Sequence, residues 1–446
     1  MLWTAGDDIP SNKKMERDMK TKHLTNCVAL ALSVVAVSAS AATTDFQMHG
    51  YIRSGILMNK DGNRVNTLNP LTYGEWRLGN EQNTKIELTP TIILTSDSGV
   101  IAKVHTNLTH ETKCTADWNC VDGDGHELQV REGYSELQGL PFAPNVVFWA
   151  GKRYSSSNTS SHQYDWEYIQ YNGTGGGFDK ADLGFARLDF GVYAFTPSGE
   201  NQADPVNKTQ QGYPEDLSAN MWLKSIGGTG LDLQFVAHTM NKNDWRTNAA
   251  EKGYGLSAVY NFADFYKIAN GYSRAVFQYG TGLAAGDSLG KNGWGFANSS
   301  GTKSWRMVMD GMASLGKVDV ATFAFYQNDS DYAPWTNAVE GAGNDRDLWA
   351  VGFRPQHQIT TNFAMQYELG YEHLNVKGTD VKGGMTKATI APTLTFESGF
   401  WSRPQLRVFA TYAKWDDGLA SKLDKGYTRN GDTDTLNFGV VGEVWF

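Results

Sequence analysis

The sequence has no long apolar segment after its first forty residues. A bilayer-spanning helix needs about 20 consecutive apolar residues, and no such run occurs between Ala42 and Phe446. The mean hydropathy is −0.44 and 20% of the residues are charged. Together these features exclude a helical membrane protein. The net charge of −9 argues against nucleic acid as a partner, because binding to phosphates needs an excess of Lys and Arg.

The first residues predict export from the cytoplasm. Two lysines precede a short apolar stretch at 27–37, and Ala-Ser-Ala follows at 39–41. A basic start, a short apolar run and a small-residue cleavage site are typical of a secretory signal peptide. We therefore expect residues 1–41 to be a signal peptide with an extra N-terminal leader, and residues 42–446 to be one mature domain.

Cysteine is scarce as well. Of the three cysteines, Cys27 is expected to leave with the signal peptide, so Cys114 and Cys120 remain. In an exported protein such a pair is expected to form a disulfide. The alternative is a metal site, but two thiols without a nearby cluster of histidines do not complete a zinc site.

Near the C-terminus, apolar residues recur at every second position. Leu436, Phe438 and Val440 fall on one face, together with the last residue, Phe446, while Asn437, Val441, Glu443 and Trp445 fall on the other. Period two is the side-chain period of a β-strand. A transmembrane barrel has such strands, apolar outward and polar inward. A half-buried strand of a soluble sandwich shows the same alternation and is the alternative.

Similar segments recur throughout the exported chain. They are rich in aromatic and β-branched residues and are separated by glycine-bearing or polar connectors. The predicted strands are 46–58, 84–95, 99–108, 128–137, 146–152, 166–171, 184–195, 219–225, 231–238, 253–261, 273–281, 305–313, 318–327, 348–355, 362–373, 386–395, 405–414 and 435–446.

The connectors between these segments alternate in length. Short turns with glycine occur at 97–99, 228–230 and 316–317, whereas long polar stretches occur at 59–74, 196–217, 282–303, 328–346 and 416–434. Short turns on one rim and long loops on the other are typical of an outer-membrane barrel. The sequence therefore predicts an all-β protein, a transmembrane antiparallel β-barrel of the bacterial outer membrane, with short periplasmic turns and long extracellular loops.

Five motifs are spread over nearly the whole exported chain. They are HGYIRSGI (49–56), RLGNE (77–81), WAGKR (149–153), WSRPQLRVFATYAKWD (401–416) and the ending EVWF (443–446). In this order they resemble the maltoporin family of sugar-specific porins, which includes sucrose- and aryl-glucoside-type channels. The resemblance implies a homotrimer of 18-stranded barrels, each with an inward-folded constriction loop and a sugar-selective pore.

Alternation assigns side chains to the lumen independently of this resemblance. With Phe46 and Met48 facing lipid, His49, Tyr51 and Arg53 face inward. The same rule places further residues inside, namely Lys85, Glu87, Gln129, Arg131, Trp401, Arg403, Arg407, Phe409, Thr411 and Trp445. Flat aromatic rings can contact the C–H faces of a sugar, and charged groups can pair with its hydroxyls. These side chains could also simply fill space and keep the pore wet.

The resemblance assigns roles to several of these residues. The family's row of aromatic side chains, the greasy slide, would comprise Tyr51, Tyr272, Trp401 and Trp445, with Trp118 at its entrance. The flanking polar track would comprise Arg53, Arg77, Glu87 and Arg131. Lys85 stands where the family usually has an aromatic residue, and it can bond to hydroxyls but cannot stack on a sugar.

The constriction loop departs further from the family. His162 and Asp165 would belong to the polar track, and Glu167 aligns with the constriction tyrosine of the maltodextrin-type members. Those members carry a basic and an acidic residue where this chain has small polar residues at 155–161. Smaller side chains should widen the opening, so we expect a different or broader glycoside specificity.

The expected function is facilitated diffusion of carbohydrates, either maltose and maltodextrins or related glycosides. A general diffusion porin without a sugar site is the alternative, and it would not need an aromatic row. The sequence has no HExxH motif and no credible triad spacing, so we do not predict an enzyme. Expected partners are sugars, outer-membrane lipid, further copies of the chain and a periplasmic sugar-binding protein, with no cofactor or metal.

Overall fold

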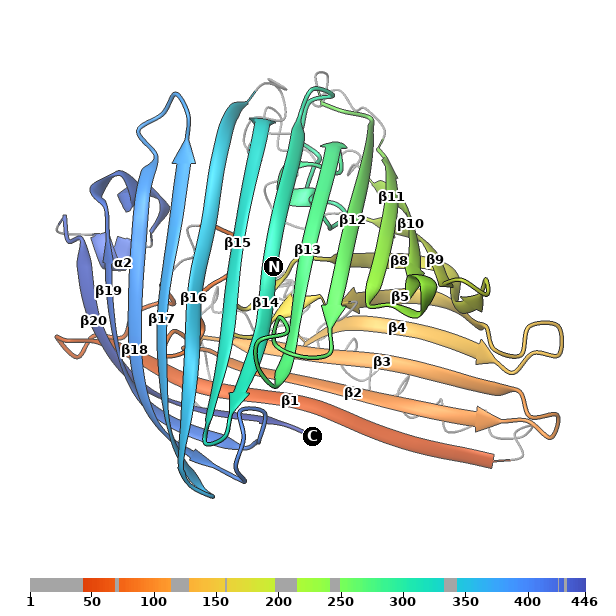
Figure 1. Ribbon diagram of the computed structural model, residues 1–446, viewed down its shortest axis with the longest axis horizontal. Coiled ribbons are helices and arrows are strands. Elements are labelled where there is room, and N and C mark those ends of the chain that lie inside the picture. Colours follow the sequence, from red (N-terminus) through yellow and green to blue (C-terminus); the bar gives the residue numbers. More distant parts are fainter. Residues whose placement is uncertain are drawn as a thin grey trace, which may run out of the picture.

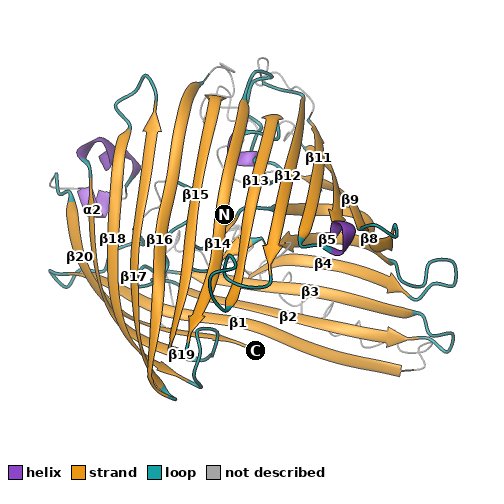
Figure 2. Ribbon diagram, viewed as in Figure 1, coloured by secondary structure: helices purple, strands orange, loops and turns teal. Residues whose placement is uncertain are grey.

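The chain folds into one closed β-barrel. The computed structural model describes residues 43–68, 72–113, 128–156, 159–196, 215–240, 249–332, 343–423, 425–428 and 431–446. Eighteen antiparallel strands form a single sheet (Figure 1). The other regular elements of the described chain are short (Figure 2). None of its helices is long and apolar enough to cross a bilayer. The predicted fold is therefore confirmed.

The barrel strands follow one another in chain order. They are β1 (Thr43–Asn59), β2 (Thr84–Thr95), β3 (Ile101–Thr112), β4 (Leu128–Gln138), β5 (Val147–Ser156), β8 (Gln170–Asp182), β9 (Arg187–Phe195), β10 (Asp216–Lys224), β11 (Leu231–Thr239), β12 (Lys252–Phe262), β13 (Gly271–Gly282), β14 (Lys303–Leu315), β15 (Val318–Tyr332), β16 (Asn344–Thr360), β17 (Phe363–Val376), β18 (Lys382–Thr395), β19 (Gln405–Trp415) and β20 (Asp434–Trp445).

Six short elements of the described chain lie in the connections between barrel strands. They are the strands β6 (Ser160–Ser161) and β7 (Trp166–Glu167), the 3-10 helices η3 (Ile226–Gly228), η4 (Gly286–Ser288) and η6 (Asp417–Lys422), and the helical turn α2 (Lys425–Thr428).

The first and last strands close the barrel. The N-terminal part of β1 pairs with β2, whereas its C-terminal part pairs with β20 from Tyr51 opposite Trp445 to Asn59 opposite Asn437. Every strand is thereby paired on both sides, which removes the open edges that would expose unpaired backbone groups to lipid.

Side chains alternate between the outer and inner faces as the sequence predicts. In β19, Leu406 and Val408 are each 58% exposed, while Arg407 and Phe409 between and after them are buried. In β20 the apolar series ending at Val440 is exposed, and Asn437, Val441 and Glu443 are buried. The exposed series faces lipid in the membrane, and the buried series faces the interior of the barrel.

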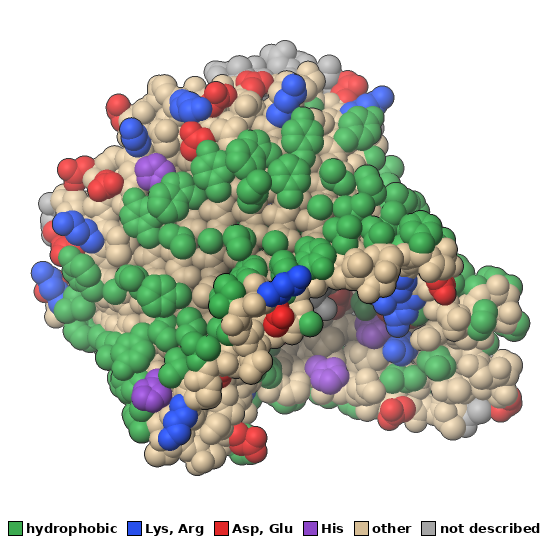
Figure 3. Space-filling view, in the orientation of Figure 1, with side chains coloured by type: hydrophobic (Ala, Val, Ile, Leu, Met, Phe, Trp, Pro, Cys, Tyr) green, Lys and Arg blue, Asp and Glu red, His purple; other side chains and the backbone are tan. Residues whose placement is uncertain are grey.

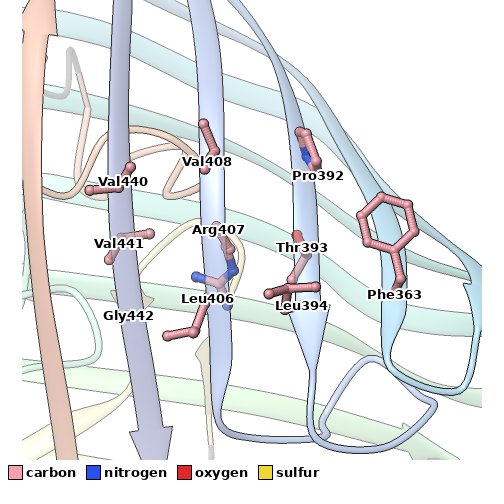
Figure 4. Close-up of a pocket in the computed structure, with 10 residues that line it drawn as sticks. All are labelled: Phe363, Pro392, Thr393, Leu394, Leu406, Arg407, Val408, Val440, Val441 and Gly442. Carbon is pink, nitrogen blue, oxygen red and sulfur yellow. The ribbon is translucent and has the colours of Figure 1, made fainter.

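The outer face is broadly apolar. Figure 3 shows hydrophobic side chains spread across the face of the upright strands, with many Lys, Arg, Asp and Glu residues along its upper edge. A shallow groove of about 410 Å³ runs over β17–β20 between Phe363, Leu394, Leu406, Val408 and Val440 (Figure 4). Leu394, Leu406, Val408 and Val440 are exposed, so this groove belongs to the lipid-facing surface and not to the pore.

One predicted strand was wrong. The segment 166–171 was expected to span the barrel, but Trp166–Glu167 is a short inner strand, and the spanning strand is β8, Gln170–Asp182. Five residues of β8, at 173–177, are Gly-Thr-Gly-Gly-Gly. Glycine is depleted in strands, so composition gave no strand signal there. An added Cβ at Gly175 or Gly177 would lie within about 2 Å of the backbone of β9, so close pairing requires glycine.

Three connecting segments fold into the barrel and form its core. We call them the first inner loop (72–83), the constriction loop (159–169) and the third inner loop (283–302). The sequence predicted inward folding only for the second. The largest cluster of buried apolar side chains joins the first two loops to the wall, with Trp76, Tyr164 and Trp166 packed on Phe323 and Phe325 of β15.

Trp76 anchors the first inner loop to the wall. Its indole is 1% exposed and lies against Gly352 of β16 and Gly370 of β17, which face each other in the sheet. A Cβ built on Gly370 would come within 2.3 Å of the indole, and one on Gly352 within 2.4 Å. The two glycines therefore provide the space into which the ring fits.

We expect Gly370→Ala to destabilise the barrel by about 1–3 kcal/mol, the usual effect of overpacking a tight site. Gly133→Ala is the matched control, because the nearest atom to its added Cβ is 4.0 Å away. Urea unfolding of the refolded barrels, followed by tryptophan fluorescence, compares the two variants. Equal stability of both would show that Trp76 can move without cost.

Candidate functional site

The constriction loop is a small hairpin held inside the barrel. β6 pairs with β7, and Asp165 in the turn between them has a positive φ of 42°. Two backbone hydrogen bonds tie the hairpin to the first inner loop: Glu75 N–H donates to the Tyr164 carbonyl (2.8 Å) and Arg77 N–H to the Gln163 carbonyl (3.1 Å). The two loops therefore form one unit across the lumen.

Glu167 is the side chain of this hairpin strand that is not fully buried. Its neighbours Trp166 and Tyr168 are 3% and 0% exposed, because Trp166 packs on Phe325 and Tyr168 donates its hydroxyl to Asp310. Glu167 is partly exposed, and its Oε2 accepts hydrogen bonds from the Tyr154 hydroxyl and from Gln170. A carboxylate and a tyrosine hydroxyl therefore lie together beside the constriction loop.

Three of the predicted slide residues lie together. Tyr51 of β1 is opposite Trp445 of β20 in the sheet, and the rings of Trp445 and Trp401 are 6.2 Å apart. His162 of the constriction loop contacts both tryptophans, at 5.3 Å from Trp401 and 5.8 Å from Trp445. The rings of His162, Trp401 and Trp445 contact one another, and Tyr51 lies beside Trp445 through the strand pairing, so the four form one aromatic surface near the rim that carries the short turns.

Trp401 reaches this surface from a turn. It lies in the β18–β19 connection and not in β19, although the alternation rule placed it on the strand's inner face. Its neighbour Phe400 packs against Met312 of β14 and Ala321 of β15, and the Phe400 N–H donates to Asp319 (3.2 Å). The turn is thereby held against another part of the wall.

Tyr272, the fourth predicted slide residue, lies farther along the wall. It is on β13 opposite Met312 of β14, and it is 40% exposed. Met312 lines a cavity of about 480 Å³ together with Trp401, Arg403 and Trp445. Within the described residues no ring contact joins Tyr272 to the other three.

A network of arginines and carboxylates lies beside the aromatic surface. Arg53 and Arg77 bind Glu81, and Glu443 accepts from Arg77 (2.5 Å), Arg403 (2.9 Å) and Arg407 (2.5 Å). The Tyr51 hydroxyl donates to Glu443 (3.0 Å), and Arg403 lies 3.8 Å above the Trp445 ring. Four guanidinium groups thus share two carboxylates, which leaves excess positive charge next to the rings.

The electrostatics of the two inner loops follow from this network. Burial raises the pKa of Glu81, but the guanidinium groups of Arg53 and Arg77 outweigh burial and lower it. Burial and the charge of Arg77 lower the pKa of His162 well below its usual range. A neutral imidazole can accept at Nδ1 the hydrogen bond that Arg77 donates (2.8 Å).

A second set of polar residues leads from the wall to the constriction. Glu87 of β2 bridges Lys85 and Arg131, each at 2.9 Å. The Arg131 guanidinium lies 3.6 Å from the centre of the Tyr154 ring, and Tyr154 in turn donates to Glu167. Lys85, Glu87, Arg131 and Glu167 therefore form a continuous polar row in which Tyr154 is the link that sequence analysis missed.

Some predictions concern parts of the chain that the structure does not describe. Trp118, Cys114 and Cys120 fall within 114–127, outside the described residues. Elsewhere in the described chain no group of three or more His, Cys, Asp or Glu side chains could hold a metal ion.

Sequence analysis also overlooked a G-x-S-x-G pattern at 286–290, which is typical of nucleophile elbows. The structure places its serine, Ser288, in the third inner loop, fully buried, with Oγ accepting from the Trp294 N–H (2.9 Å). Among the described residues no hydrogen bond joins a histidine to Ser288.

Comparison with known proteins decides the family. Residues 46–446 match the LamB porin family model, which covers nearly the whole chain. The chain belongs to the LamB porin family. It is accordingly a porin, a multi-pass β-barrel of the outer membrane, and the resemblance inferred from the five motifs is confirmed.

Solved porin structures resemble the barrel at low identity. OccAB1 of Acinetobacter baumannii gives a TM-score of 0.49 at 12% identity, covering 92% of this chain and 98% of that one. OprD of Pseudomonas aeruginosa gives 0.48 at 9% identity, covering 92% and 95%. The trimer form of OmpT of Vibrio cholerae gives 0.39 at 11% identity, covering 91% and 100%.

We expect Glu167→Gln to lower the cation-to-anion permeability ratio of the pore. The lumen carboxylate concentrates counter-ions, and this effect is strongest at low salt, where screening is weak. The reversal potential across planar bilayers under a salt gradient measures the ratio. Asp97→Asn, on an exposed short turn, is the control. A ratio equal to that of the parent would mean that Glu167 does not face the ion path.

Proposed function

We propose that this porin is a channel for facilitated diffusion of carbohydrates across the outer membrane. The observation that carries the proposal is the aromatic surface of Tyr51, Trp401 and Trp445 beside a network of four arginines and two carboxylates. A pyranose has apolar C–H faces and a rim of hydroxyls. Rings can contact the faces, and charged donors and acceptors can bind the rim.

The arrangement also suits release. Several weak sites along a path allow a solute to enter and leave, whereas one tight site would trap it. The aromatic surface and the polar row from Lys85 to Glu167 offer such successive contacts. A general diffusion porin remains the second candidate. It would need the charges but would gain nothing from the grouped rings.

The proposed solutes are maltose and maltodextrins or related glycosides. Lys85 and Glu167, which replace aromatic residues expected from the resemblance, favour a solute bound more by hydrogen bonds than by stacking in this part of the pore. We retain the homotrimer as the proposed assembly, and migration of an unheated sample in detergent tests it. A periplasmic sugar-binding protein has no support and is not part of the proposal.

The Cys114–Cys120 disulfide also stays a prediction. Intact-mass measurement of the unreduced protein should give a mass two hydrogens below that of the dithiol. Alkylation of both thiols without prior reduction would contradict the bond.

Replacing Trp401 or Trp445 with Ala should weaken the binding of the sugar that blocks the ion current by about 1–3 kcal/mol. This range is that of base–aromatic stacking, which serves as an analogue. Bare conductance should change little, because neither ring carries charge. Titration of single-channel current with maltotriose and with sucrose measures the block. Phe142→Ala, which removes a ring that is 79% exposed on a connection, is the control. Unchanged block in both tryptophan variants would refute the aromatic site while leaving the barrel intact.

A further inference from the structure

The third inner loop runs alongside the constriction loop. Its backbone at Gly290 accepts a hydrogen bond from the Gln170 N–H (2.8 Å), and Lys291 pairs with Gln170 in a parallel bridge. Asn292 then exchanges two hydrogen bonds with the backbone of Asn172, at 3.0 and 2.7 Å. The loop therefore adds a short strand-like segment beside the point where the constriction loop joins β8.

This segment is fixed from the other side too. The Gly293 N–H donates to Asp216 of β10 (2.6 Å), and Arg306 of β14 donates to both the Leu289 and Tyr168 carbonyls (2.6 and 2.9 Å). Arg306 thus links the third inner loop to the constriction loop. Because residues on both sides of Lys291 are tied down, the position of its backbone is well defined.

The ammonium of Lys291 has no partner among the described residues. The side chain is partly exposed, and no described group accepts a hydrogen bond from it or forms an ion pair with it. The acidic groups that act on it electrostatically are Glu167 and Asp287. Asp287 is already bound by Arg346 (2.9 Å) and by the Tyr332 hydroxyl (2.7 Å).

Glu167 has spare capacity for a hydrogen bond. Both of its donors, Tyr154 and Gln170, bind Oε2, and no described group donates to Oε1. Burial and the charge of Arg306 lower the pKa of Lys291 to about 8, so the ammonium is mostly protonated at pH 7. Lys291 thus carries an ammonium without a described partner on the segment that pairs with Gln170, and the Gln170 side chain in turn binds Glu167.

We propose that Lys291 is a specificity-determining residue of the pore, which together with Glu167 binds the hydroxyls of a neutral sugar at the constriction. A hydroxyl can donate to Glu167 while a neighbouring hydroxyl accepts from Lys291. Hydrogen bonds to charged groups are the stronger ones. Opposite charges on two loops also offset each other, so the pair favours polar neutral solutes over ions of either sign. This inference rests on the proposed sugar channel.

Lys291→Gln tests the proposal in planar bilayers with maltotriose and sucrose as probes. We expect the cation-to-anion permeability ratio to rise at low salt, because Glu167 is no longer offset. The sugar concentration for half-maximal block should rise about tenfold, the effect of losing one hydrogen bond to a charged group. The double variant Lys291→Gln/Glu167→Gln should bring the ratio back towards that of the parent while the block stays weak.

Two controls separate charge from position. Lys317→Gln removes the same charge from an exposed turn between β14 and β15 and should leave both measurements unchanged. Lys291→Arg keeps the charge and should keep the parental ratio, and it tests the site should the Gln variant not fold.

The proposal is wrong if Lys291→Gln keeps both the ratio and the sugar block of the parent. Failure of the sugar function gives a different result. If the protein is not a sugar channel, the parent itself shows no block by either sugar. The cation-to-anion permeability ratio of Lys291→Gln then decides, and a ratio equal to that of the parent excludes Lys291 from the pore lining.

Discussion

The packing of two inner loops against the inside of the barrel wall is the interaction on which the pore depends. Trp76, Tyr164 and Trp166 bury their rings against Phe323 and Phe325, so the main apolar core lies within the barrel while the outer face is apolar toward lipid. Truncating one buried Trp or Phe costs about 3–5 kcal/mol. This cluster fixes the constriction hairpin, and through it the position of Glu167 and His162.

The charges depend on the same packing. Arg77 and Glu81 come from the first inner loop, yet they complete a network with Arg53, Arg407 and Glu443 of the wall and with Arg403 of the β18–β19 connection. Removing one partner of such a buried pair costs about 3–5 kcal/mol, because the remaining charge loses its compensation. Removing one charged partner therefore costs about as much stability as truncating one of the buried rings, about 3–5 kcal/mol in each case. It also leaves more guanidinium than carboxylate groups beside Trp445.

Alternation predicted the wall of the barrel well, because a strand with lipid on one side must place its apolar residues at every second position. It correctly put Arg407 and Glu443 inside and Leu406 and Val440 outside. Composition failed for β8, where close pairing selects glycine. The constriction could be predicted only in part. Glu167 was proposed from the resemblance, whereas Lys291 lies in a loop with no periodicity, and its place beside Gln170 arises from tertiary packing alone.

The most direct test of the sugar channel is single-channel recording of the unmodified protein while sugars are added to one side. The aromatic rings, and the arginines and carboxylates that can bind sugar hydroxyls, predict that maltotriose or a related glycoside reduces the ion current in a saturable manner. The account also predicts that an uncharged polymer of similar size, such as a short polyethylene glycol, produces no saturable block, because it offers neither a ring face nor clustered hydroxyls. Current that no sugar in a broad panel reduces, or that sugar and polymer reduce equally, would contradict the account and leave a general diffusion porin.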